Sequence, residues 1–189
     1  WGDRIPHLEG KRDGSQVWVV DGTTLTMRGV ASVGAIMPDR NLEPQRWDEV
    51  PPSSYKPSER LRAMDADGVD YQVLYPTVAG VSGEIVGAIT DADLELECVQ
   101  AYNDWIIEDW ASYSPRFVAQ CLIPISSPAA AAAEARRSVA KGHRGIVMPA
   151  TPWNLKDVPH INDPSWDALW QACQELDVPI CFHSGSSSK

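Results

Sequence analysis

The residue with the clearest potential for chemistry is His183, which ends a short apolar run over residues 178–183 and precedes Ser184 and Gly185. The run predicts a buried β-strand, and the Ser-Gly pair predicts a turn directly after it. In a barrel of parallel strands, the carboxyl ends of the strands form the floor of the active site. An imidazole at that place can bind a metal ion or transfer a proton. Taken alone, the same histidine also fits a hydrogen-bonded core residue, so the rest of the chain must decide.

The elements that would position His183 are strands and helices that alternate along the chain. Strands are predicted over residues 69–76, 117–125, 145–149 and 178–183, and helices over residues 57–64, 91–113, 128–140 and after the N-cap Asp163. This order is typical of βαβ units with a parallel sheet. A doubly wound sheet and a (β/α)8 barrel both remain open on the pattern alone. The sequence contains no Gly-x-Gly-x-x-Gly fingerprint and no phosphate loop, which removes the commonest reasons for an open nucleotide-binding sheet.

Composition limits the class of protein. The chain has 189 residues, a net charge of −10 and 43% apolar residues, which suits one ordinary domain or part of a larger one. The acidic balance argues against nucleic acid or an anionic membrane surface as a partner. No apolar run approaches the roughly 20 residues of a membrane span, and no signal peptide is visible. The irregularly spaced cysteines predict reduced core residues of a cytoplasmic protein: Cys98, Cys121, Cys173 and Cys181.

Several segments, taken in order, resemble the amidohydrolase-2 family, which includes aminocarboxymuconate-semialdehyde decarboxylase and related aromatic-acid decarboxylases. Residues 60–74 follow the family pattern R-x-x-x-M-D-x-x-G-V-D-x-Q-V. The other matching segments are residues 101–105, 114–117, 142–146, 163–170 and 179–183. Their common order makes the resemblance far more specific than any single segment.

The resemblance implies a (β/α)8 TIM barrel that holds one divalent metal ion, usually zinc, although manganese or another divalent ion also fits. The family's metal ligands are a histidine-containing motif on the first strand, a histidine ending the fifth strand and an aspartate after the eighth. The four predicted strands then correspond to strands two to five, and His183 matches the fifth-strand ligand. Residues 1–56 become an insertion with a hairpin and loops, and residues 57–189 a partial barrel.

The chain departs from the family pattern in the ligands that it lacks. It contains no His-x-His, and the first strand, strands six to eight, the proton-transfer histidine and the last aspartate are all missing. Four strands cannot close an eight-stranded barrel, and one histidine cannot hold a catalytic zinc ion. We therefore expect the chain to be a piece of a longer protein, and we expect no catalytic residue within it.

Three further residues are candidates for substrate binding. Arg28 lies in the insertion from which, in the decarboxylases, a basic residue holds the substrate carboxylate, and arginine suits a bidentate clamp. A surface arginine is the alternative. Thr77 and Thr151 follow the second and fourth barrel strands and are expected to line the pocket.

Other polar residues have structural explanations. Asn103 and Asp104 lie in the middle of a predicted helix and are interpreted as structural. His143 follows a helix C-terminus, where a partly positive imidazole is favoured by the helix dipole.

The sequence therefore predicts a metal-dependent enzyme, a carboxy-lyase that acts on a small aromatic or unsaturated carboxylic acid. A metal-dependent hydrolase of a C–C, ester, lactone or amide bond is the alternative, because this scaffold carries both chemistries. A metal-free barrel that works as a binding protein is the alternative outside enzymes. The expected partners are the small acid and a second copy of the protein in a homodimer, with neither nucleic acid nor a membrane.

Overall fold

A computed structural model describes residues 1–26 and 44–183 of the chain. The chain forms two compact units, Trp1–Gln72 and Val73–Lys189. The sequence-based division after residue 56 stays a prediction. Arg28 lies outside the described residues. No helix within the described ranges has the length and apolar character that a membrane span needs.

The first unit contains a three-stranded antiparallel sheet. Its strands are β1 (His7–Gly10), β2 (Gln16–Val20) and β3 (Thr23–Thr26), in the order β1-β2-β3. The predicted hairpin is confirmed: Asp21 and Gly22 have φ angles of 45° and 77° at the turn between β2 and β3, as a tight hairpin turn requires. Sequence reasoning missed β1, because its four residues include no β-branched or aromatic side chain.

The described part of the first unit also contains four helices. They are η1 (Gly2–Arg4), η2 (Trp47–Glu49), η3 (Pro52–Ser54) and α2 (Pro57–Asp67). The predicted helix α2 begins at a proline and ends before Gly68, whose φ of 68° forms a left-handed cap. Arg60 of α2 is buried, and its Nε donates to the Ser53 carbonyl at 2.5 Å.

The second unit contains the strands that the sequence predicts. They are β4 (Gln72–Leu74), β5 (Phe117–Ala119), β6 (Cys121–Leu122), β7 (Ile146–Pro149) and β8 (Ile180–His183). β4 pairs with β5, whereas β6, β7 and β8 form a parallel sheet in that order. Gln120 alone separates β5 from β6, so the predicted strand over residues 117–125 forms in two short pieces. The fold class is mixed α/β, and the numbering of these strands as two to five of a barrel stays a prediction.

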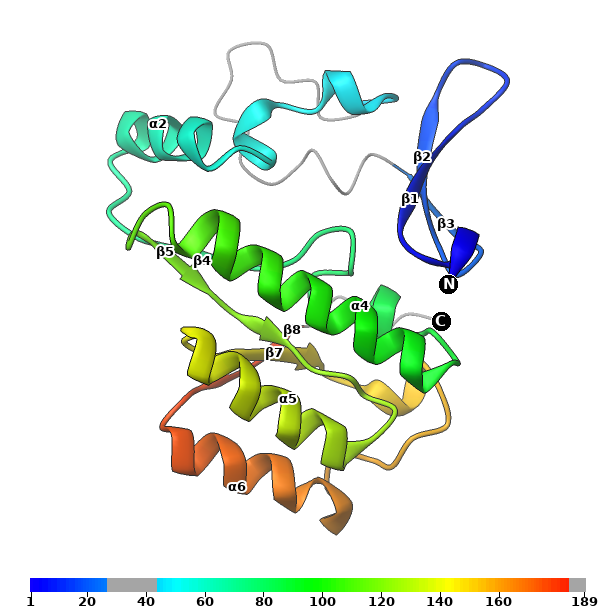
Figure 1. The fold of residues 1–189 in the computed structure, drawn as a ribbon, viewed down its shortest axis with the longest axis vertical. Coiled ribbons are helices and arrows are strands. Elements are labelled where there is room, and N and C mark those ends of the chain that lie inside the picture. Colours follow the sequence, from blue (N-terminus) through cyan, green and yellow to red (C-terminus); the bar gives the residue numbers. More distant parts are fainter. Residues whose placement is uncertain (27–43, 184–189) are drawn as a thin grey trace. The chain divides into compact units, whose positions relative to one another are not determined.

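Helices alternate with these strands. They are α3 (Glu84–Gly87), α4 (Ala92–Trp105), the π-helix η4 (Ile106–Ala111), α5 (Pro128–Lys141), η5 (Pro152–Asn154), η6 (Pro164–Trp166) and α6 (Asp167–Leu176). Figure 1 shows α4, α5 and α6 side by side along the strands, with α5 in the middle. Asp91, Ser127 and the predicted cap Asp163 each accept a hydrogen bond from a backbone N–H of the first turn.

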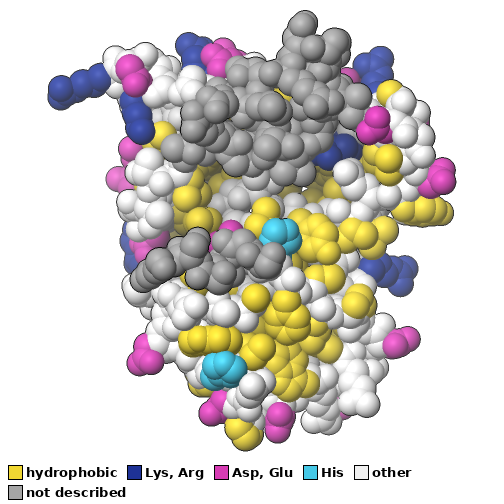
Figure 2. Space-filling view, turned by 180° about the vertical axis from the view of Figure 1, so that it is seen from behind, with side chains coloured by type: hydrophobic (Ala, Val, Ile, Leu, Met, Phe, Trp, Pro, Cys, Tyr) yellow, Lys and Arg dark blue, Asp and Glu magenta, His cyan; other side chains and the backbone are white. Residues whose placement is uncertain are grey.

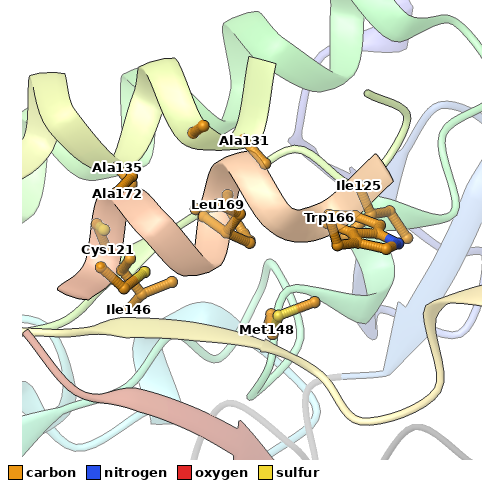
Figure 3. Close-up of a cluster of buried hydrophobic side chains, with 12 residues drawn as sticks. Cys121, Ile125, Ala131, Ala135, Ile146, Met148, Trp166, Leu169 and Ala172 are labelled. Atoms are coloured by element: carbon orange, nitrogen blue, oxygen red, sulfur yellow. The ribbon is translucent and has the colours of Figure 1, made fainter. Parts of the chain in front are cut away.

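The core of the second unit lies between the strands and the pair α5 and α6, and Figure 3 shows it in close-up. Cys121, Ile146 and Met148 point from the strands toward Leu169 and Trp166 of the helical layer. Alanines on α5 let the two helices pack closely, so the alanine-rich segment is a structural helix. All four cysteines are free, and Cys98 and Cys181 are only partly buried. This core fixes which face of the strands points to the helices and which face remains for a site.

A polar network fastens α4 to α5 and to the strands. The Asn103 amide donates to the Leu122 carbonyl at 2.9 Å, and its oxygen accepts from the Leu122 N–H at 2.8 Å. Asn103 also donates to buried Glu134, which Arg137 pairs with at 2.7 Å. Asp104 pairs with Arg137 at 2.7 Å. The structural interpretation of Asn103 and Asp104 is confirmed.

The interpretation of His143 as a partly positive imidazole at a helix end is wrong. The side chain is 1% exposed, and its Nε2 donates to the Asn103 carbonyl at 3.0 Å. Burial lowers the pKa of His143, because the interior penalises the charged imidazolium. His143 is therefore a neutral core histidine.

Candidate metal and substrate site

β8 places His183 on the face of the strands that points away from the helices. Ile180 packs against the core cluster, and side chains alternate between the faces of a strand. Cys181 and His183 therefore share the opposite face. β8 ends at His183, as the sequence predicts. His183 pairs with Pro149 of β7.

The prediction that this strand is buried is wrong. Phe182 is 47% exposed, and His183 is exposed as well. The physical reason is that β8 is an edge strand, because within the described part of the chain its only neighbour is β7. Figure 2 shows hydrophobic side chains gathered over one face of the molecule, with histidine side chains beside them.

Tyr75, which directly follows β4, contacts the His183 ring. The two ring centroids are 6.2 Å apart, and the ring planes make an angle of 60°, so the contact is edge-to-face. β4 and β8 are the first and last strands of the second unit, and the contact brings their carboxyl ends together. The carboxyl ends of a strand from each sheet therefore lie near each other, as strand ends around one barrel mouth would.

Tyr75 also interacts with a residue of β8 other than His183. A hydrogen bond with the Cys181 side chain, together with burial, raises the pKa of Tyr75 to about 12. The hydroxyl is therefore protonated near neutral pH. The Cys181 thiol in turn donates to Gln120 Oε1 at 3.8 Å, within the longer range for sulfur. Gln120 is buried, and its side-chain amide packs against Gly145. Any side chain at position 145 would overlap the Gln120 amide.

The two candidate threonines lie beyond the ends of their strands. Thr77 and Thr151 are both partly buried. Thr151 Oγ1 is a buried atom, and it has no hydrogen-bond partner in the part of the chain that the structure describes. A buried hydroxyl without a partner is unusual and marks a place where a further polar group can bind. No hydrogen bond among the described residues joins either threonine to His183.

A buried ion pair connects the loops that follow three of the strands, and sequence reasoning missed it. Lys156 Nζ donates to Glu95 Oε2 at 2.9 Å, to Ser126 Oγ at 2.7 Å and to the Ile89 carbonyl at 2.5 Å. Glu95 is 0% exposed, and its other oxygen accepts the Ile125 N–H at 2.7 Å. We call Ile89, Glu95, Ser126 and Lys156 the loop junction.

The loop junction fixes the chain around Thr151. Ile89 lies between β4 and α4, Ser126 between β6 and α5, and Lys156 between β7 and α6. The Lys156 N–H donates to the carbonyl of Pro152, the residue directly after Thr151, so the anchored lysine also holds this loop. No pattern in the sequence points to the pair, because Glu95 and Lys156 are 61 residues apart.

The described residues do not by themselves complete a metal site. None of them form a group of three or more His, Cys, Asp and Glu side chains that could hold an ion. His183 fits one ligand of such a site, since its imidazole is exposed and makes no hydrogen bond to any residue that the structure describes. Three protein ligands and an open position are typical of a catalytic metal.

Comparison with known proteins shows the family. The model of the amidohydrolase-2 family, described as Amidohydrolase, matches residues 20–188. The chain belongs to the amidohydrolase-2 family. The resemblance inferred from the ordered sequence segments is thereby confirmed.

Curated relatives of this amidohydrolase are decarboxylases. The chain is 32% identical over 127 residues to Decarboxylase orsB of Emericella nidulans, covering 66% of this chain and 34% of the relative. It is 30% identical over 127 residues to gamma-resorcylate decarboxylase of Rhizobium radiobacter, covering 66% and 37%. The chain thus spans about a third of the length of these relatives.

Solved structures show the same fold. A 2,6-dihydroxybenzoate decarboxylase in complex with 2,6-dihydroxybenzoate has a TM-score of 0.56 and 27% identity, covering 66% of this chain and 38% of its own. An amidohydrolase of Mycobacterium avium subsp. paratuberculosis has a TM-score of 0.70 and 20% identity over 97% and 52%. A 5-carboxyvanillate decarboxylase of Novosphingobium aromaticivorans with bound manganese has a TM-score of 0.58 and 24% identity over 68% and 36%.

Proposed function

We propose that the protein is a metal-dependent carboxy-lyase that removes CO2 from a small aromatic or unsaturated carboxylic acid. The observation that carries the proposal is the position of His183. Its exposed imidazole ends a strand of an amidohydrolase α/β unit and contacts Tyr75, which follows the carboxyl end of β4. The decarboxylase relatives and the 2,6-dihydroxybenzoate complex support the class of reaction and the class of substrate.

In this proposal the described strands are strands two to five of a (β/α)8 barrel, and His183 is the fifth-strand metal ligand. A bound divalent ion would supply a Lewis acid that polarises an oxygen of the substrate. Zinc is the metal expected from the resemblance, and the manganese of the 5-carboxyvanillate decarboxylase makes Mn²⁺ the second ion to test. The homodimer and the cytoplasmic location stay predictions.

The chain's own residues would bind and orient the acid. Thr151 Oγ1 is the buried hydroxyl without a described partner, so it can donate to the substrate carboxylate or to a ring hydroxyl. Thr77 lines the same pocket two residues after Tyr75 in this proposal, and Arg28 supplies a charged clamp for the carboxylate. The loop junction keeps the Thr151 loop in place, which favours a preformed pocket.

The test is an assay of the purified full-length protein, loaded with Zn²⁺ or Mn²⁺, against a panel of hydroxybenzoates and muconates. We expect metal-dependent release of CO2 with at least one of them. Cleavage of esters or lactones without CO2 would establish the hydrolase instead. A protein that binds neither metal and converts no substrate would be the metal-free binding protein.

Replacing Thr151 with valine tests the pocket. Valine keeps the shape and removes the hydroxyl, so a hydrogen bond to an anionic substrate is lost while no protein hydrogen bond among the described residues is broken. We expect the KM of the decarboxylation to rise about tenfold or more, because a bond to a charged group is worth about 1.5–3 kcal/mol. Thermal unfolding should change little. Exposed Thr90→Val is the matched control, and equal KM values for the two variants would exclude Thr151 from the pocket.

A further inference from the structure

The end of β8 leaves the His183 ring with few neighbours to hold it. The imidazole is exposed, lies on an edge strand and makes no hydrogen bond within the described ranges. Rotation about its side-chain torsions is therefore limited mainly by the aromatic ring that packs against it. That ring belongs to Tyr75, from the opposite edge of the strands.

We propose that Tyr75 is the positioning residue that sets the orientation of the His183 imidazole toward the metal. The inference rests on the proposed function and adds a residue to it. Tyr75 does not ligate the ion in this proposal. It limits the rotation of the ligand, as the outer partners of metal-bound histidines do elsewhere.

The contact has a defined geometry. At 6.2 Å between centroids and 60° between planes, the edge of one ring meets the face of the other, which aromatic pairs prefer over direct stacking. The edge-to-face arrangement allows a smaller range of imidazole orientations than an aliphatic neighbour would, because the electrostatics of the rings are directional.

Tyr75 can limit another side chain because it is itself anchored. Its side chain lies beside Cys181, which is two residues before His183 on the same face of β8. The Cys181 thiol donates to Gln120, and Gln120 is fixed where it is buried against Gly145. Tyr75 thus contacts the β8 residue His183 through its ring, and its backbone directly follows β4. An aromatic ring keeps the edge-to-face contact with His183, whereas an aliphatic side chain loses it.

The expected effect on metal binding is moderate. Removing an outer partner that hydrogen-bonds to a metal-bound histidine typically weakens metal binding by about 10–100-fold. Tyr75 holds His183 by ring contact alone, so we expect a loss of about three- to tenfold in Tyr75→Leu. In Tyr75→Phe the ring remains, and we expect affinity within about threefold of the wild type.

The first measurement follows the histidine ring without any metal. NMR spectra of the chelator-treated full-length protein, labelled at histidine, would be recorded for the wild type, Tyr75→Phe and Tyr75→Leu, with His183→Ala assigning the resonance. We expect the His183 ring signal to move in Tyr75→Leu and to stay near its place in Tyr75→Phe. The signals of His7 and His160 should stay fixed. An unmoved His183 signal in Tyr75→Leu would overturn the proposal.

The second measurement is the affinity for Mn²⁺ and Zn²⁺ in competition with a chelator. Tyr113→Leu is the matched control, since it removes a half-exposed tyrosine without a described aromatic partner. Weaker binding in Tyr75→Leu, with wild-type binding in Tyr113→Leu and Tyr75→Phe, supports the positioning role. Wild-type affinity in Tyr75→Leu contradicts it. If the wild type binds no metal while the NMR signal still moves, the proposed function fails and the orientation of His183 by Tyr75 stands.

Discussion

Replacing His183 with alanine in the full-length protein is expected to weaken metal binding by at least about 100-fold and to abolish CO2 release. The lower limit follows because the loss of a residue that only hydrogen-bonds to a metal ligand can already weaken metal affinity by about 100-fold. A residue that ligates the metal directly contributes more to that affinity. The fold should survive, since the imidazole is exposed and bonds to no described residue. Metal content after dialysis and chelator competition would measure metal binding. Thermal unfolding in the presence of chelator would measure whether the fold survives.

His7→Ala is the control for this experiment. His7 is a partly exposed histidine whose ring bonds to the Ile5 carbonyl at 2.7 Å and to Glu9 at 3.1 Å. Its removal should leave the metal content unchanged, so it separates a specific ligand from a general loss of histidine. Full metal content in His183→Ala would exclude His183 as a ligand and with it the proposed site.

The sequence was sufficient to predict the elements that position His183. The sequence marks the ends of strands locally, because an apolar run stops there, as at Pro149 and His183. It also marks helix starts locally, because a cap such as Asp163 bonds within one turn. The order of strand and helix then indicates the parallel sheet. The position of a strand at the edge of the sheet depends on its neighbours, which is why β8 was wrongly predicted to be buried.

Prediction failed where polar side chains are buried. The helix predicted over residues 91–113 has an apolar stripe made up of Leu94, Cys98, Ala101, Trp105 and Ile106. Leu94 and Ile106 are buried as the pattern predicts, yet Trp105 is 41% exposed. Glu95 and Asn103 are buried instead, because they bond to backbone groups of the strands. A hydropathy pattern assigns such residues to solvent, since their partners lie 19 to 30 residues away. Tyr75 was missed as a neighbour of His183 because the two residues lie far apart in the sequence and meet only in the folded chain.

The buried pair of the loop junction leads to the second large effect. We expect Glu95→Leu to reduce the free energy of unfolding by about 3–5 kcal/mol, which is the usual cost of leaving one buried charge without its partner. Lys156 is 11% exposed and would lose its counter-charge. The N–H groups of Ile125 and Ser126 would lose their acceptor at the same time. Urea unfolding of the full-length protein would measure the loss, with exposed Glu97→Leu expected within about 0.5 kcal/mol of wild type.

The partner variant Lys156→Met should cost less than Glu95→Leu, because the Glu95 carboxylate keeps its bonds from Ile125, from the Ser126 N–H and from the Ser126 hydroxyl. The double variant should recover only part of the loss, since an apolar pair restores the charge balance but leaves the two N–H groups without an acceptor. The three free energies form a double-mutant cycle whose coupling term isolates the ion pair. A coupling energy near zero would show that the carboxylate serves the backbone alone. In that case Glu95 holds only the backbone at residues 125–126, and Lys156 holds the Ile89 carbonyl independently of its charge pairing with Glu95.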